Sequence, residues 1–213
     1  MCGVCGVLNF NGEEISPVLL RRMTDAIAHR GPDGEGWYRD KGVGLGHRRL
    51  AIVDLSPLGH QPMVTRDGRY ALSYNGEIYN FLEIRSELAA LGYVFRSQTD
   101  SEVVLNAWAE WGAACVPRFN GMFAFALWDS RDEKLFLVRD RYGIKPIYYG
   151  IFGDSVVFGS EQRAILQHPT ASRNLDKHAL VEYFTFQNIF TDRTFNDAIK
   201  ILPAGNIATF DTR

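Results

Sequence analysis

The most reactive group in this sequence is a cysteine at the second position, directly after Met1. If the initiator methionine is removed, Cys2 becomes the N-terminal residue and carries a thiol and a free α-amine on one residue. An α-amine has a reference pKa of about 7.7–8.0, so it can act near neutral pH as the general base for its own thiol, and no separate histidine is needed. We therefore predict that Cys2 is a catalytic nucleophile.

Two alternatives for Cys2 are packing and metal or redox chemistry. Cysteine often packs as a small hydrophobe. Cys2 and Cys5 have C-x-x-C spacing, but a redox pair of this kind follows a strand within a βαβ unit. A zinc site normally takes four ligands, and the third cysteine, Cys115, has no second pair member nearby. We expect no metal site and assign Cys115 to the core.

A basic segment, His47-Arg48-Arg49, lies in otherwise apolar surroundings. Burying an arginine without a partner is unfavourable, so Arg49 needs an anion. A structural aspartate such as Asp54 would serve, and so would a substrate carboxylate held by two hydrogen bonds. The residues alone leave both open.

The segment Asn75-Gly76-Glu77 follows an expected strand. Asn-Gly is most often a simple turn. The functional alternative is an oxyanion hole, with the Asn75 side-chain amide and the Gly76 N–H aimed at one point, while Glu77 binds an ammonium group. Asp100 lies in the first turn of an expected helix, where a carboxylate complements the helix dipole.

Short strands and separate helices would position these residues. Alternating or continuous apolar runs predict strands at 4–10, 43–53, 70–74, 122–128, 134–138, 147–152 and 155–158, with a hairpin over 199–210. Capping signals predict helices after Ser16-Pro17, Asn80, Thr99 and Asp176, and a short one over 161–166. We expect an α+β fold in which two antiparallel sheets pack face to face with helices outside.

The composition excludes several classes. The 213 residues carry a net charge of −2, so no basic field indicates nucleic acid. Three cysteines, an odd number, argue against a disulfide framework and favour a reducing, cytoplasmic location. No apolar run approaches the roughly 20 residues of a membrane helix, so we expect no membrane association.

Several segments together resemble a known family. The chain is similar to the glutaminase domain of class II glutamine amidotransferases, the N-terminal nucleophile type, and within them to glutamine-hydrolysing asparagine synthetases. The resemblance rests on segments that occur in order along the chain, namely Met1-Cys2-Gly3, His29-Arg30-Gly31-Pro32-Asp33, the run 46–54, Tyr74-Asn75-Gly76-Glu77-Ile78-Tyr79-Asn80, Thr99-Asp100-Ser101-Glu102, the run 120–126 and Arg139-Asp140-Arg141-Tyr142-Gly143-Ile144-Lys145-Pro146.

The resemblance implies a four-layer αββα fold and assigns roles. Cys2 would attack the side-chain amide of L-glutamine and form a thioester that water hydrolyses to glutamate, while Asn75 and Gly76 stabilise the oxyanion. The substrate-binding residues implied are Arg49 for the α-carboxylate, Glu77 and Asp100 for the α-ammonium group, and the backbone of Leu50, Ala51, Ile52 and Val53.

The resemblance also implies a partner region. We expect residues 1–213 to be one glutaminase domain without a cofactor of its own. No Ser-Gly-Gly-x-Asp-Ser-like pyrophosphate loop is present, so ATP and Mg²⁺ would belong to a C-terminal synthetase domain absent from this chain, which would receive the ammonia and amidate aspartate. A different carboxylate acceptor, another amide substrate, a glutamine-binding regulatory module and assembly as a homodimer remain open alternatives.

Overall fold

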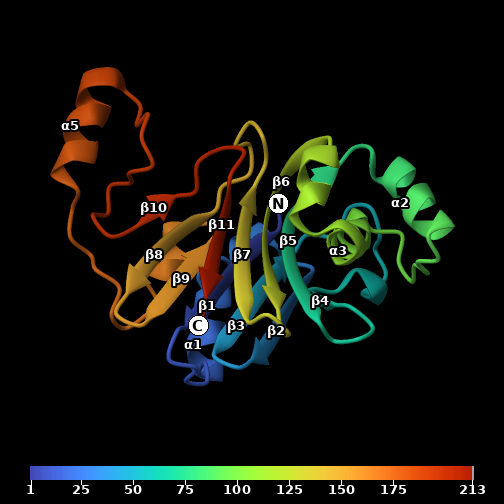
Figure 1. The fold of residues 1–213 in the computed structure, drawn as a ribbon. Helices are drawn as coiled ribbons and strands as arrows, with labels where there is room; N and C mark the ends of the chain where they lie inside the picture. The colour runs from blue at the N-terminus through green and yellow to red at the C-terminus, as the bar shows by residue number, and fades with distance from the viewer. Residues whose placement is uncertain (213) are drawn as a thin grey trace.

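The computed structural model describes residues 1–212 as a sandwich of two sheets between helices (Figure 1). The strands are β1 (Gly3–Asn9), β2 (Gly34–Asp40), β3 (Val43–Arg49), β4 (Met63–Val64), β5 (Tyr70–Ile78), β6 (Gly121–Asp129), β7 (Lys134–Arg139), β8 (Tyr148–Phe152), β9 (Ser155–Gly159), β10 (Lys200–Ile201) and β11 (Ile207–Asp211). The α-helices are α1 (Pro17–Asp25), α2 (Phe81–Ala90), α3 (Asp100–Trp111), α4 (Gln162–Ile165) and α5 (Lys177–Phe186). Short 3₁₀ helices cover Ala28–Arg30, Pro57–Gly59 and Gly112–Arg118.

All strand pairs are antiparallel. The first sheet has six strands in the order β10-β8-β9-β1-β3-β2, and the second has five in the order β11-β7-β6-β5-β4. The N-terminal strand β1 lies inside the first sheet between β3 and β9. The start of the chain is therefore held on both sides by a rigid sheet.

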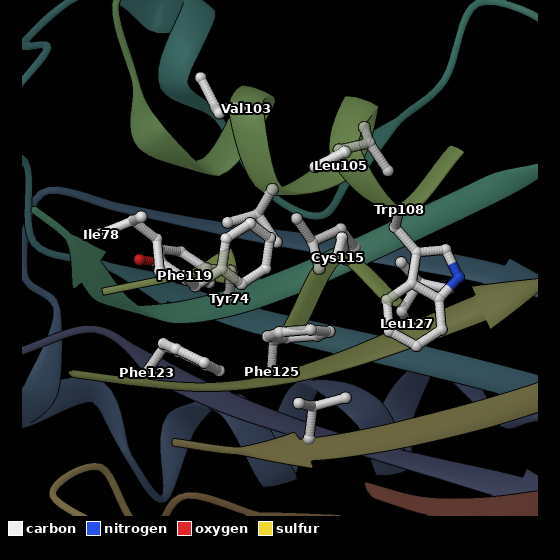
Figure 2. Close-up of a cluster of buried hydrophobic side chains, with 14 of the residues drawn as sticks. Tyr74, Ile78, Val103, Leu105, Trp108, Cys115, Phe119, Phe123, Phe125 and Leu127 are labelled. Carbon is white, nitrogen blue, oxygen red and sulfur yellow. The ribbon is translucent and has the colours of Figure 1, made fainter. Parts of the chain in front are cut away.

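Three hydrophobic cores separate four layers. One core lies between the sheets and contains Leu8, Leu45, Trp128 and Leu135. A second lies between the first sheet and helices α1 and α4, and a third between the second sheet and helices α2 and α3. Figure 2 shows the third core, where side chains of α3 pack on β5 and β6. The predicted α+β fold with two face-to-face sheets is confirmed.

Most predicted elements are confirmed, but the strand predicted over 43–53 ends at Arg49, and two connections are different. The Asn11-Gly12 dipeptide at the end of the first predicted strand is typical of a hairpin turn, but β1 pairs with β3 and β9 and the chain continues into α1. The segment 199–210 is no hairpin either, because β10 pairs with β8 in the first sheet and β11 with β7 in the second. Both errors concern strand partners, which local turn signals do not determine when the partner is distant in sequence.

The predicted helix caps are only partly formed. Asp176 accepts hydrogen bonds from the amides of His178 and Ala179, as expected. Thr99 caps α3, but the Glu102 carboxylate accepts from the amides of Arg96 and Ser97 instead of closing a capping box. The Ser16 and Asn80 side chains cap no helix; Asn80 bonds Arg118 and Asn120 across the fold. Within residues 1–212, no helix is long and apolar enough to cross a membrane.

Candidate active site

A cavity of about 100 Å³ opens beside the N-terminal end of β1, next to β5 of the facing sheet. All ten candidate residues line it: Cys2, Arg49, Leu50, Ala51, Ile52, Val53, Asn75, Gly76, Glu77 and Asp100. They come from the residue before β1, the end of β3 and the loop after it, the second half of β5, and the first residue of α3. Segments up to about a hundred residues apart in sequence therefore meet at one place.

Cys2 lies just before β1, whose first paired residue, Gly3, is opposite Arg48 of β3. The amide of Leu50 donates a hydrogen bond to the Cys2 sulfur at 3.3 Å, and the thiol lies 3.6 Å from the Leu50 carbonyl oxygen. Burial raises the pKa of the Cys2 thiol, although the hydrogen bond from the Leu50 amide acts in the opposite direction. The thiol is therefore protonated at neutral pH and needs a base before it can attack.

Asn75 and Gly76 lie within a strand and not in a turn. In the β5–β6 ladder Asn75 is opposite Ala124 and Gly76 is opposite Phe123. Asn75 is 2% exposed, and its side-chain amide nitrogen has no hydrogen-bond partner among the described residues. A buried donor without a partner is unfavourable by about 1–3 kcal/mol, so this amide is available for a group that enters the cavity.

The backbone amide of Gly76 points toward the cavity edge of β5. Tyr79 donates its amide to Asn120, and the alternation of an antiparallel ladder then directs the amides of residues 74, 76 and 78 to the opposite edge. The Tyr74 amide donates a hydrogen bond to the Gln61 side-chain oxygen at 2.7 Å, and the Ile78 amide donates one to the Asp100 carboxylate at 3.0 Å. The Gly76 N–H lies between them, beyond the two residues of β5 that β4 covers, Ala71 and Leu72.

Only glycine fits at position 76. A Cβ atom there would lie 2.6 Å from the carbonyl oxygen of Met122 and 2.6 Å from the Cβ of Phe123. The glycine therefore allows β5 and β6 to approach closely while its amide faces the cavity.

Arg49 is anchored by backbone oxygens, and Asp54 is not its carboxylate partner. Its guanidinium donates to the carbonyl of Ser56 at 2.8 Å and to the carbonyl of Asp54. The Asp54 carboxylate instead accepts from the amides of Ser56 and Gln98. The positive charge of Arg49 is thus held at the cavity without a neutralising carboxylate among these contacts.

Two carboxylates lie on the same cavity. The Asp100 carboxylate is buried and accepts hydrogen bonds from the Tyr74 hydroxyl at 2.7 Å and the Ile78 amide at 3.0 Å. Burial raises the pKa of Asp100, and the hydrogen bonds from Tyr74 and Ile78 oppose this rise. Glu77 lines the cavity from β5. Arg49, Glu77 and Asp100 around a nucleophile suit a small zwitterion that carries both an α-carboxylate and an α-ammonium group.

The segment 29–33 supports the wall of the cavity. The amide of Asp33 donates to the carbonyl of Arg49 at 3.0 Å, and its carboxylate accepts from the amide of Ala51 at 2.9 Å. A Cβ at Gly31 would lie 2.4 Å from the backbone of Arg48. The glycine therefore lets this segment press against the end of β3.

Sequence reasoning missed Gln61, Tyr74 and Lys145, which also line the cavity. Gln61 is buried and bridges the Tyr74 amide to the Ser101 hydroxyl, which lies 3.1 Å from its side-chain nitrogen. Nothing local in the sequence marks Gln61, because its role depends on contacts with β5 and α3. Among residues 1–212, no three histidine, cysteine, aspartate or glutamate side chains converge as a metal site would require.

Comparison with known proteins places this chain in one family. Residues 1–213 match the family model described as a glutamine amidotransferase domain. The chain is 37% identical over 211 residues to glutamine-hydrolysing asparagine synthetase 1 of Bacillus subtilis (strain 168), covering 97% of this chain and 33% of that protein. It is 42% identical over 187 residues to asparagine synthetase 3 of the same organism, covering 86% and 30%. The chain thus spans about a third of the length of these relatives.

A solved structure has a similar fold. The glutamine phosphoribosylpyrophosphate amidotransferase from B. subtilis, solved with ADP and GMP, superposes with a TM-score of 0.66 at 21% identity over 77% of this chain and 43% of that one. At this identity the match supports the fold alone.

Proposed function

This chain belongs to the glutamine amidotransferase domain family, and from that premise we propose that it releases ammonia from the side-chain amide of L-glutamine with Cys2 as the nucleophile. The observation that supports this most directly is the buried Asn75 amide without a partner, on the same cavity as the Cys2 thiol. A preorganised donor of this kind is what a developing oxyanion requires.

Removal of Met1 would free the α-amine of Cys2. The amine would take the thiol proton, since burial keeps the thiol in its protonated form. The sulfur then attacks the amide carbon, and the oxyanion is stabilised by the Asn75 amide and the Gly76 N–H. The protonated amine returns its proton to the leaving ammonia, and water hydrolyses the resulting thioester to glutamate.

Substrate binding follows from the charges around the cavity. Arg49 would hold the α-carboxylate of glutamine with the donors left free by Ser56 and Asp54. Glu77 and Asp100 would hold the α-ammonium group, and the backbone of residues 50–53 would line the chain of the substrate. This arrangement disfavours amides that lack the α-amino acid zwitterion, because such substrates would offer no opposite charge to Arg49, Glu77 or Asp100.

The fate of ammonia is suggested by the relatives. We propose that residues 1–213 are the glutaminase half of a longer system, in which a synthetase region that uses ATP and Mg²⁺ amidates a carboxylate, with aspartate as the first candidate because the relatives are asparagine synthetases. No step within this chain uses ATP or the metal. The three free cysteines suit a reducing compartment, and we place the reaction in the cytoplasm.

The test is glutamate release from L-glutamine by the wild type and by Cys2→Ala, with intact mass to measure the fraction of chains that lack Met1. We expect hydrolysis by the processed wild type and none by the variant. A processed wild type that binds glutamine without hydrolysing it would overturn the proposed activity in favour of a binding module.

A further inference from the structure

The backbone of the nucleophile is held by residues that do not line the cavity. Strand β9 pairs with β1 only as far as Cys5, opposite Gly159. Ser160 extends the pairing by one residue, since its amide donates to the Val4 carbonyl at 2.8 Å and its hydroxyl accepts from the Val4 amide at 3.0 Å. Cys2 itself lies beyond the reach of β9.

Arg30 holds Cys2 at this point. Its Nε donates to the Cys2 carbonyl oxygen at 2.9 Å, and its aliphatic part packs near Gly3, where an added Cβ would lie 3.4 Å from the Arg30 Cδ. The Arg30 side chain is nearly buried, with 9% of it exposed. The position of this guanidinium therefore sets the position of the residue that carries the thiol and the α-amine.

Glu161 in turn fixes Arg30. Its Oε1 accepts from the Arg30 Nη1 at 3.0 Å and lies 2.8 Å from the His29 ring nitrogen, and its Oε2 lies 3.1 Å from the Arg163 Nε. The Arg30 Nη2 is buried without a partner among the described residues. Such an unsatisfied donor is unfavourable, whereas the Nε and Nη1 donors of the same side chain are used on Cys2 and Glu161.

We propose that Arg30 and Glu161 are positioning residues for Cys2. The Glu161 carboxylate fixes the orientation of the Arg30 guanidinium, and the guanidinium fixes the position of the Cys2 carbonyl group. This inference rests on the proposed role of Cys2. Neither residue touches the cavity, so their loss should disturb the attack geometry and leave the glutamine-binding groups in place. A misplacement of about 1 Å at a reacting centre can lower a rate about 100-fold.

The test compares Glu161→Gln with two controls in steady-state glutamine hydrolysis. Glu87→Gln removes the carboxylate of another arginine pair, Arg118–Glu87, away from the cavity. Arg163→Gln removes one exposed partner of Glu161 and leaves the Arg30 contact in place. Each rate is divided by the fraction of chains that lack Met1, measured by intact mass. We expect Glu161→Gln to lower kcat about 10- to 100-fold with KM within about threefold, and both controls to behave as the wild type.

A second variant separates positioning from folding. Arg30→Lys keeps the charge but loses the Nε donor, and we expect it to lower kcat in the same way. Adding Glu161→Gln to Arg30→Lys should then lower kcat little further, because the two residues act as one unit. A kcat of Glu161→Gln within twofold of wild type, a rise in KM alone, or additive losses in the double variant would overturn the inference. An inactive processed wild type would instead overturn the proposed function.

Discussion

Replacing Asn75 with alanine should lower activity without lowering stability. The side-chain amide is buried and has no partner among residues 1–212, so it contributes a donor to the transition state and an unsatisfied group to the fold. Loss of one oxyanion donor raises the barrier by about 3–4 kcal/mol, which is about a 10²- to 10³-fold decrease in kcat. KM should change little, because the donor acts mainly on charge that develops in the transition state.

The free energy of unfolding of Asn75→Ala should rise or stay unchanged. An unpaired buried donor is unfavourable by about 1–3 kcal/mol, and its removal offsets the packing that the truncated side chain loses. The assay is glutaminase kinetics together with urea unfolding of the same sample.

Asn80→Ala is the matched control. The Asn80 side chain donates to the Arg118 carbonyl at 3.0 Å and accepts from the Asn120 amide at 2.9 Å, so its loss should lower stability and leave kcat unchanged. A kcat of Asn75→Ala within fivefold of wild type, or a loss of stability as large as that of Asn80→Ala, would refute the assignment of Asn75 as a free donor.

Three further outcomes are expected. Arg49→Lys should raise KM for glutamine about 30-fold or more in saturation kinetics, because a substrate carboxylate loses its planar two-donor partner; an unchanged KM would contradict the binding role. Gly76→Ala should lower the free energy of unfolding by about 1–3 kcal/mol and reduce activity, because the new Cβ would lie 2.6 Å from the Met122 carbonyl oxygen. Gly34→Ala is the control, since its Cβ would lie 3.7 Å from the nearest atom. Urea unfolding and kinetics should show neither change for this control. Burial lowers the pKa of His47 to about 3 from 6.5, so on acidification His47 is protonated in the unfolded chain before it is protonated in the folded one. The free energy of unfolding should therefore fall by about 2 kcal/mol between pH 7 and pH 5. His47→Gln should show a smaller fall over this range, and an equal fall in both proteins would show that His47 does not cause it.

Part of the site could be predicted because its chemistry is local. Cys2 beside the initiator methionine, the charges of Arg49, Glu77 and Asp100, and the paired donors of Asn75 and Gly76 are all readable as residue types in the sequence. Apolar alternation likewise predicted most strands, because each strand places successive side chains on opposite faces. The layered α+β architecture followed from these strands and from helices separated from them in sequence.

What the sequence by itself determined is therefore the set of reactive groups and the elements that carry them. Only the tertiary structure decided that Asn75-Gly76 continues a strand and that Arg49 is anchored by backbone carbonyls. It also decided that the Gln61 side chain accepts from the Tyr74 amide, while the Gly76 amide on the same edge stays available. The physical reason is that a backbone group in a sheet is satisfied by residues far away in sequence, so whether a given N–H is bonded or available depends on strand register and on the segments that cover the sheet edge. No local pattern contains that information.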